Sequence, residues 1–467
     1  MNLLARIFSV EALLPKQHFN DNLPSTKTVY KTTLKMAWPS AMEAVLISLI
    51  GAVDMIMVSS LGSEAVAAVG ITTQPKFLLM AFVFAINTGV TVIVSRRKGA
   101  NDAASANLAL RNGLILTVII ASLASVLSYV FAKPFLMFAG ANVSYIDTAV
   151  VYFRIVVIGA FFALMGSTIT AAQRGAGNTR ISMTTNLAAN LVNVVFNYFL
   201  IFGIGFFPAW GVMGAAVATA IGNFVGFVMA VHSVVKRSSF LKLKLRERWS
   251  LDRPTVETLW TISSTALVEQ VFIRIGFLLY AKAVANLGTI EFATHYIAMQ
   301  VMSITFSVGD GLSIANTALV GQSLGAKRPD LAILYGRVSQ RVGLVISVVL
   351  GLVIILSRHG IMGLFSTDPQ VLALGGDILI ILSFIVIFQI SQVITVGSLR
   401  GAGDVKFVAM LSLVSVTFVR PILTYFLAYA LGMGLYGAWF SVVFDQGIRF
   451  VVSRTRFQQA KWTHIVV

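Results

Sequence analysis

Twelve long apolar stretches alternate with short polar segments along the chain. Each has about the 20 residues that an α-helix needs to cross the hydrocarbon core of a bilayer. The pattern therefore predicts an all-α membrane protein with twelve transmembrane helices. The stretches cover residues 36–60, 77–95, 113–133, 149–172, 181–203, 211–235, 260–285, 296–321, 340–358, 374–397, 407–431 and 435–452.

The basic residues predict the orientation of these spans. When the outermost two residues of each span are counted with the adjoining segment, the two ends of the chain and the segments after even-numbered spans hold 27 of the 35 Lys and Arg residues, and the opposite segments hold three. Cytoplasmic segments carry such an excess, so both ends are predicted to be cytoplasmic, in the plasma (inner) membrane. We interpret residues 1–35 as a cytoplasmic leader, 236–259 as a basic linker and 453–467 as a cytoplasmic tail.

The two halves of the chain repeat each other at an offset of 226 residues. Six spans per half is an even number, so both halves enter the membrane from the same side, as in a parallel repeat. We predict two pseudo-symmetric six-helix lobes, an N-lobe (36–235) and a C-lobe (260–452), around a central cleft. The matched pairs are Glu43 with Glu269, Leu61-Gly62 with Leu287-Gly288, Gln74 with Gln300, Gly99-Ala100 with Gly325-Ala326, Arg111 with Arg337, and Arg174-Gly175-Ala176-Gly177 with Arg400-Gly401-Ala402-Gly403.

Composition narrows the class of protein further. Of the 467 residues, 57% are hydrophobic and only 11% are charged, whereas soluble domains are about 25% charged. The net charge of +17 is explained by the cytoplasmic segments, and no basic run is interleaved with stacking aromatics, so we expect no nucleic-acid partner. The absence of Cys excludes thiol catalysis and thiolate metal sites.

Several motifs, in this order, resemble those of the multidrug and toxic-compound extrusion (MATE) transporters. The similarity covers residues 36–452 and implies export of bulky, often cationic organic compounds, coupled to inward flow of Na⁺ or H⁺. The motifs are Ala52-Val53-Asp54 with Met57-Val58 and Leu61-Gly62, Gln173-Arg174-Gly175-Ala176-Gly177-Asn178-Thr179-Arg180, Gly211-Val212-Met213-Gly214-Ala215-Ala216-Val217-Ala218-Thr219, Val320-Gly321-Gln322-Ser323-Leu324-Gly325-Ala326, and Leu399-Arg400-Gly401-Ala402-Gly403-Asp404.

Asp54 is the first candidate for a coupling residue. It lies in the middle of an apolar span with no basic neighbour in sequence. A carboxylate in that position can bind Na⁺, or hold a proton when burial disfavours its charge. The resemblance implies this coupling role, and the alternative is an acid satisfied by neighbouring helices. The repeat places Tyr280 opposite Asp54, so the two halves are expected to divide their tasks.

Glu43 precedes Asp54 by eleven residues, which puts both on one helix face about 16 Å apart along the axis. We interpret Glu43 either as a second relay acid or as an acid close to the cytoplasmic water. Pro39, near the predicted start of the span, is a candidate hinge. The alternative is an ordinary first-turn proline.

The fifth span carries an amide stripe, because Asn186, Asn190, Asn193 and Asn197 share one helix face. One interpretation is hydrogen bonding between helices. The other, favoured for Asn193 and Asn197, is a network with Asp54 that binds Na⁺ through amide oxygens. The resemblance adds Thr219 to the same pocket. Some members of the family have an aspartate where Asn197 stands, so a two-carboxylate proton scheme is in doubt here.

The second half offers its own candidates for coupling or substrate binding. The resemblance implies such a role for Glu269, and the alternative is an ion pair with Arg274. Asp310 is expected to pair with Arg274 or to contact a cationic substrate. One branch of the family has an aspartate nine residues before Ser398, where this chain has Gln389. Any coupling in this half therefore falls to Glu269 and Asp310, and Gln389 binds substrate or packs.

The sequence therefore predicts a monomeric secondary antiporter in the lipid bilayer that moves a small organic substrate. It needs no cofactor beyond its coupling ion, Na⁺ or H⁺. A lipid-linked oligosaccharide flippase of the same superfamily is the alternative, for which fourteen spans and a strongly cationic cleft are expected. An enzyme is not expected, because the sequence shows no catalytic dyad, metal-ligand spacing or phosphate-binding loop.

Overall fold

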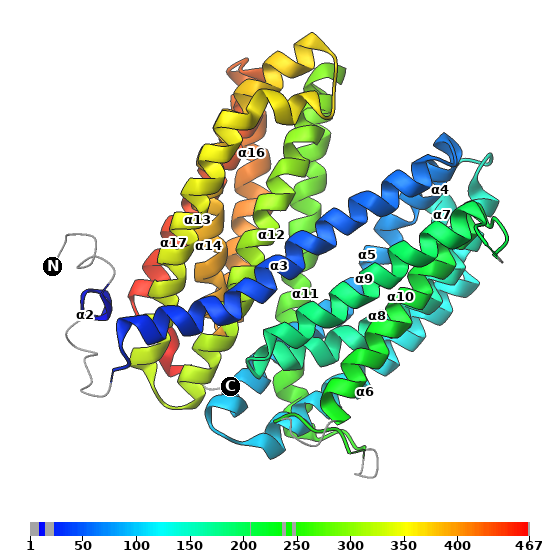
Figure 1. The fold of residues 1–467 in the computed structure, drawn as a ribbon. Coiled ribbons are helices and arrows are strands. Elements are labelled where there is room, and N and C mark those ends of the chain that lie inside the picture. The colour runs from blue at the N-terminus through cyan, green and yellow to red at the C-terminus, as the bar shows by residue number, and fades with distance from the viewer. Residues whose placement is uncertain (1–8, 15–22, 206, 236–239, 245–248, 466–467) are drawn as a thin grey trace. The chain divides into compact units, whose positions relative to one another are not determined.

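The computed structural model describes residues 9–14, 23–205, 207–235, 240–244 and 249–465, and almost all of them are helical (Figure 1). Each of the twelve predicted spans corresponds to a long helical segment, which confirms the all-α membrane fold. In the described residues, eleven helices are long and apolar enough to cross a membrane. The twelfth span corresponds to α17 (Gly434–Gln458), which is 25 residues long and carries Asp445 and Arg449 in its middle.

In its described residues, the first half contains six long helices and three short ones. Short helices α4 and α7 were not predicted, because each is far shorter than a bilayer span. The elements are α2 (Val10–Leu13), α3 (Thr26–Ser59), α4 (Ser63–Ile71), α5 (Thr73–Gly99), α6 (Ala103–Val130), α7 (Ala132–Phe138), α8 (Ile146–Gly175), α9 (Thr179–Phe202) and α10 (Gly211–Val235).

The second half repeats the order of the long helices, with one span divided into several helical types. Residues 405–430 form a single span in which two π-helical segments, η2 and η3, interrupt the α-helix. The elements are α11 (Arg253–Ala285), α12 (Thr289–Gly325), α13 (Pro329–Gly363), α14 (Pro369–Gly401), α15 (Val405–Ser412), η2 (Leu413–Val419), α16 (Arg420–Tyr425), η3 (Phe426–Ala430), α17 and the 3₁₀ turn η4 (Lys461–His464).

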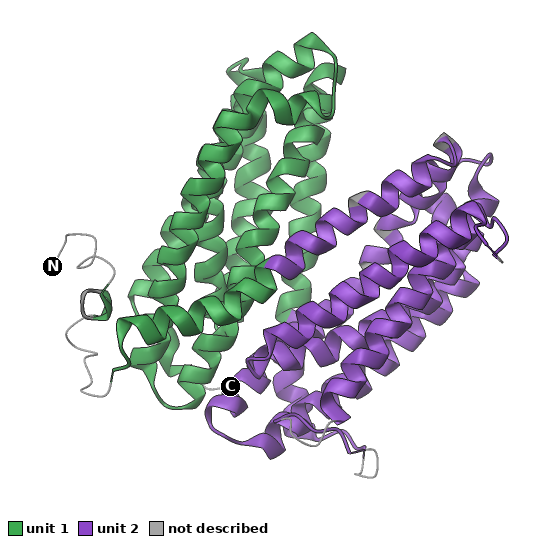
Figure 2. Cartoon of the chain, viewed as in Figure 1, with its two compact units in different colours: residues 1–41, 265–467 green, residues 42–264 purple. Residues whose placement is uncertain are grey.

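The chain forms two compact units whose boundaries differ from the predicted lobes (Figure 2). Unit 2 is residues 42–264, and unit 1 combines residues 1–41 with 265–467. The start of α3 thus belongs with the second half of the sequence: Met36 and Ala37 join the hydrophobic core of unit 1. The start of α3 therefore falls in unit 1, and residues 260–264 of α11 fall in unit 2. The predicted lobe boundaries at 36 and 260 did not show this exchange of helix ends, because hydropathy indicates the length of a helix and not its neighbours.

Parts of the predicted leader and of the predicted linker are helical. Helix α3 begins at Thr26, inside the predicted leader. The hydropathy pattern did not indicate this start, because the lysines at 27, 31 and 35 interrupt the apolar run although lysine is compatible with a helix. Residues 1–8 and 15–22 of the leader and 236–239 and 245–248 of the linker lie outside the described residues.

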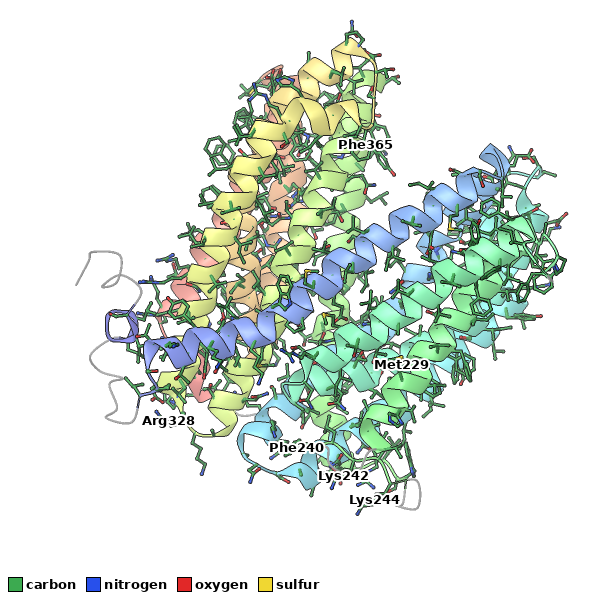
Figure 3. All side chains as sticks on the ribbon, in the orientation of Figure 1. Met229, Phe240, Lys242, Lys244, Arg328 and Phe365 are labelled. Carbon is green, nitrogen blue, oxygen red and sulfur yellow. The ribbon has the colours of Figure 1, made fainter. Side chains whose placement is uncertain are left out.

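The described part of the linker packs on unit 2. The Lys98 ammonium lies 4.0 Å from the centre of the Phe240 ring, and the Lys242 backbone amide donates to Asn107 Oδ1 at 2.6 Å. Figure 3 shows Phe240, Lys242 and Lys244 together at one end of this unit. These contacts join the linker to the helix ends that follow the second predicted span.

The 226-residue repeat extends to the backbone turns. Left-handed φ angles of 90° and 85° occur at Gly177 and Gly403, and both Asn101 and Lys327 have a φ of 57°. Each pair is separated by the repeat offset. The same turns therefore connect corresponding helices in the two halves.

Small residues bring α9 and α10 close together in unit 2. A Cβ atom on Gly222 would lie 2.5 Å from the Ala189 carbonyl oxygen and 3.0 Å from the Asn193 Cβ. Such close backbone contact is typical of packing between membrane helices. Gly222 therefore fixes the place of Asn193, one of the predicted site residues.

We predict that Gly222→Leu lowers stability by about 1–3 kcal/mol, because the added side chain overpacks this contact. The measurement is the thermal unfolding midpoint of the purified protein in detergent. Gly360→Leu is the matched control, since nothing lies within 4 Å of a Cβ at that position. An equal loss in both variants would contradict the packing argument.

Candidate functional site

Helices α3 and α9 are paired in a constant register. The Asn186 side chain donates to Glu43 and the Asn197 side chain donates to Asp54, and each pair is 143 residues apart. The two ends of the amide stripe on α9 therefore serve different carboxylates of α3, while Asn190 between them donates to the Asn186 carbonyl oxygen. Glu43 and Asp54 do share a helix face, as predicted, but each has its own amide partners.

Asp54 is held by amides from α9. Asn197 Nδ2 donates to Asp54 Oδ1 at 2.8 Å. The Asn193 amide is assigned with its nitrogen toward Asp54, at 2.8 and 3.0 Å, and its oxygen toward Thr219, because only this orientation satisfies both neighbours. Asp54, Asn193, Asn197 and Thr219 are thus brought together as the sequence predicted.

A cavity of about 120 Å³ adjoins the Asp54 carboxylate, and Tyr152, Asn197 and Thr219 also line it. Asn197 Oδ1 is buried and receives no hydrogen bond. Carboxylate, amide and hydroxyl oxygens are the ligands that hard cations prefer. The oxygen set beside this cavity fits a small cation, with Asn197 Oδ1 as the acceptor that lacks a donor.

Two residues near Asp54 were missed by sequence reasoning. Tyr152 of α8 lines the cavity, and its hydroxyl interacts electrostatically with Asp54. Lys76 of α5 also acts on Asp54 electrostatically. Neither position stands out in the sequence, because Tyr152 follows the apolar pattern and Lys76 falls in a predicted loop. Asp54 therefore has a cationic neighbour that its own helix does not reveal.

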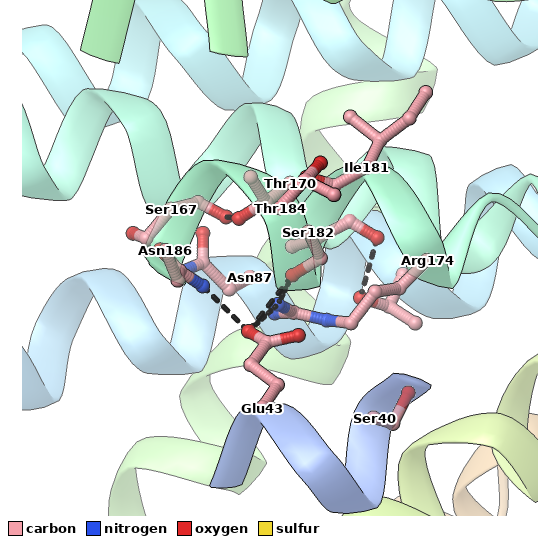
Figure 4. Close-up of polar contacts among 12 residues, drawn as sticks. Ser40, Glu43, Asn87, Ser167, Thr170, Arg174, Ile181, Ser182, Thr184 and Asn186 are labelled. Atoms are coloured by element: carbon pink, nitrogen blue, oxygen red, sulfur yellow. Dashed lines mark hydrogen bonds and ion pairs between the residues drawn. The ribbon is translucent and has the colours of Figure 1, made fainter. Parts of the chain in front are cut away.

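Glu43 is the centre of a second polar cluster, shown in Figure 4. Its carboxylate accepts hydrogen bonds from Ser182 Oγ at 2.9 Å and from Asn186, and the Arg174 guanidinium lies 3.7 Å away. Arg174 also donates to Ser182 Oγ at 2.8 Å. We call Glu43, Arg174, Ser182 and Asn186 the unit 2 clamp, because they join α3, α8 and α9.

The same arrangement occurs in unit 1. The Glu269 carboxylate accepts from Arg400 at 2.7 Å and from Ser412 Oγ at 2.9 Å. Glu269, Arg400 and Ser412, the unit 1 clamp, are the repeat counterparts of Glu43, Arg174 and Asn186. The ion-pair partner of Glu269 is therefore Arg400 of α14, whereas the sequence had suggested Arg274 of its own helix.

In unit 1, the guanidinium group of Arg420 occupies the counterpart of the Asp54 site. The repeat offset places Tyr280 opposite Asp54 and Asp445 opposite Thr219. Asp445 accepts from the Arg420 guanidinium and from Ser415, and the guanidinium carbon lies 5.7 Å from the centre of the Tyr280 ring. Arg420 and Asp445 are 1% and 0% exposed.

Other predicted residues are spread over unit 1. Gln389 is buried and accepts from Thr305 Oγ1 at 3.3 Å, which is a packing contact between α14 and α12. Asp310 lies on α12 and Arg274 on α11, and both have interaction partners. Pro39 lies inside α3, thirteen residues after the helix begins, so it is no first-turn proline.

The structure thus has a duplicated set of membrane-spanning helices, and such internal repeats are found in many transporters. The family model MatE matches residues 39–199 and 266–426. The chain therefore belongs to the MatE family, and the resemblance to MATE transporters is confirmed.

Relatives match along nearly the whole chain. A probable multidrug resistance protein NorM of Thermotoga maritima is 25% identical over 95% of this chain and 96% of its own. An uncharacterized transporter, YisQ, of Bacillus subtilis is 25% identical over 94% and 96%. A solved structure, described as the outward-facing conformation of a multidrug resistance MATE family transporter, matches with a TM-score of 0.86 and 20% identity over 93% of this chain and 97% of its own. The last match supports the fold.

We predict that Arg420→Met strongly destabilises the protein, by about 3–5 kcal/mol, because it leaves the Asp445 carboxylate buried without its counter-ion. Thermal unfolding in detergent measures the loss, and the double variant Arg420→Met with Asp445→Leu is expected to recover most of it. Arg253→Met is the control, because Arg253 pairs with Glu257 at an exposed position. A single variant as stable as this control would show that the buried pair is not needed.

Proposed function

We propose that the protein is a secondary antiporter that exports organic compounds, drug-like and cationic or amphipathic, in exchange for inward Na⁺ or H⁺. The coupling ion binds at Asp54, with Asn193, Asn197 and Thr219. The observation that carries this proposal is the buried Asn197 oxygen without a donor, beside the cavity that Asp54 lines. A bound Na⁺ gives this oxygen a partner, and a proton on Asp54 changes its hydrogen bonds to both amides.

Transport by alternating access requires the two units to move, and α3 runs through both of them. Pro39 has no backbone N–H to donate, so it removes one hydrogen bond from the helix interior. It lies two residues before the boundary between residues 41 and 42. We therefore propose Pro39 as the hinge in α3, and Glu43 as the acid that fixes the helix just beyond it.

The buried Arg420 of unit 1 is an argument for only one ion site, the one at Asp54 in unit 2. The Arg420 guanidinium takes the counterpart place, where it satisfies Asp445. Coupling therefore falls to unit 2, and the residues Glu269, Arg274, Asp310 and Gln389 are left for substrate binding or for transmitting movement.

Names of relatives and the family match favour a transporter over the flippase alternative. We propose that the protein acts as a monomer in the plasma (inner) membrane with both ends in the cytoplasm. The excess of basic residues in the predicted cytoplasmic segments supports this orientation.

We predict that Asp54→Asn abolishes gradient-driven export, because the amide can neither bind Na⁺ by charge nor exchange a proton. The measurement is transport of a fluorescent organic cation by proteoliposomes, with a Na⁺ gradient and a pH gradient imposed separately. The gradient that drives the wild-type protein identifies the ion.

The control is Asp147→Asn, which removes a carboxylate that is 85% exposed and paired at the surface with Lys133. It is expected to transport at the wild-type rate. Export by Asp54→Asn at that rate would remove Asp54 from the mechanism. Transport of no organic compound by the wild-type protein under either gradient would contradict antiport itself.

We predict that Glu269→Gln slows export without preventing insertion, and that it does so more than Glu43→Gln does. Both variants break one arginine pair in matching clamps, but Glu269 also acts electrostatically on Arg449, which donates to Ser412 Oγ at 3.4 Å. The measurements are transport rate per reconstituted molecule and thermal midpoint. An equal loss of transport rate in Glu269→Gln and Glu43→Gln would show that Glu269 acts only as a structural residue of its clamp.

A further inference from the structure

A basic cavity of about 560 Å³ lies in unit 1, and neither the unit 1 clamp residues nor Arg420 line it. It is formed mainly by α14 and by α13 and α17, which both pack against α14. Three arginines line it, Arg337 and Arg341 from α13 and Arg454 from α17. None of the lining residues that the structure describes is acidic.

The guanidinium group of Arg337 has two like charges as neighbours. The positive charges of Arg454 and Arg341 both act on Arg337. Its Nη1 donates to the Leu13 carbonyl oxygen of α2 at 2.6 Å, so it is held at the edge of the cavity. Gathering three positive charges around one cavity is unfavourable unless an anion neutralises them.

An apolar groove of about 420 Å³ adjoins this cavity, and Phe388 lines both. The other groove residues come from α17, and all of them are apolar: Val443, Phe444, Gly447, Ile448, Val451 and Val452. Phe444 and Val451 are more than half exposed. The groove is thus an open hydrophobic surface beside a positive one.

The order of these features along α17 matches the depth of a lipid. Arg454 lies close to the end of the helix that is predicted to be cytoplasmic, and Val443 lies eleven residues deeper, about 16 Å along the axis. Half of a typical hydrocarbon core is about 15 Å thick. The positive cavity is therefore at headgroup level and the groove at acyl-chain level.

We propose that the cavity and groove together bind one anionic phospholipid of the cytoplasmic leaflet. The lipid phosphate contacts Arg337, Arg341 and Arg454, whose planar guanidinium groups suit phosphate oxygens. One acyl chain lies along Phe388 and the apolar face of α17. Basic pockets between helices on the cytoplasmic side are suited to such headgroups.

The test is native mass spectrometry of the full-length protein in detergent, with phosphatidylglycerol as the probe and phosphatidylcholine and inorganic phosphate as comparisons. Wild-type protein is expected to retain one phosphatidylglycerol and to prefer it over phosphatidylcholine about tenfold or more. Excess inorganic phosphate should not displace it, since free phosphate has no acyl chain for the groove.

Charge is tested with the triple variant Arg337→Gln, Arg341→Gln and Arg454→Gln. The matched control, Arg97→Gln, Arg180→Gln and Arg253→Gln, removes the same charge from exposed positions predicted to be cytoplasmic. The first variant should lose the preference for phosphatidylglycerol and the control should keep it. An equal loss in both would mean that general electrostatic attraction, and no built site, holds the lipid.

The groove is tested with Gly447→Leu, which keeps all three arginines. Nothing lies within 4 Å of a Cβ on Gly447, so the leucine fills the groove without a clash, and Gly360→Leu is the control for an added leucine on an open helix face. Gly447→Leu should weaken phosphatidylglycerol binding about tenfold while elution volume and thermal midpoint match the control. Unchanged binding in Gly447→Leu, or displacement of lipid by phosphate, would overturn the two-part site.

Discussion

A charge within a hydrocarbon layer must be satisfied by the protein itself, and this requirement organises the whole molecule. The register between the first and fifth helices of each half meets it. The partner of a carboxylate stands 143 residues further along the chain at Glu43, at Asp54 and again at Glu269. Because the two helices run parallel, one register satisfies acids at two depths of α3. Both clamps and the Asp54 site depend on it.

The same frame carries different chemistry in the two halves. In unit 2, the Asn197 oxygen beside Asp54 accepts no hydrogen bond. In unit 1, the Arg420 guanidinium occupies the matching place and pairs with Asp445. The π-helical segment Leu413–Val419 ends directly before Arg420, and its wider turns change which side chains of this span face inward. The two halves thus share one scaffold, and the half in unit 2 has a cavity beside its carboxylate.

Sequence patterns predicted what is local or repeated. Hydropathy located every span, and the spacing of Asn193 and Asn197 placed both on the Asp54 face. The pairing of Glu269 with Arg400 was missed because it joins positions 131 residues apart on different helices, although the repeat aligned both residues with the other clamp. Arg420 was missed as well, because a π-helical segment leaves no clear signal in the sequence. The ion-binding role of the Asp54 site stays a prediction.

The exchange of helix ends between the units bears on how the protein is made. Residues 42–264 are contiguous, so unit 2 has all its parts once the first half and the start of α11 have been synthesised. Residues 26–41 leave the ribosome earlier, yet their partners in unit 1 come from residues 265–467. The start of α3 therefore cannot complete its packing until helices of the second half have been synthesised, among them α12, whose Gly311 lies against Ala41. Until then, the apolar side chains that this segment contributes to the core of unit 1, such as Met36 and Ala37, lack their partners in the chain.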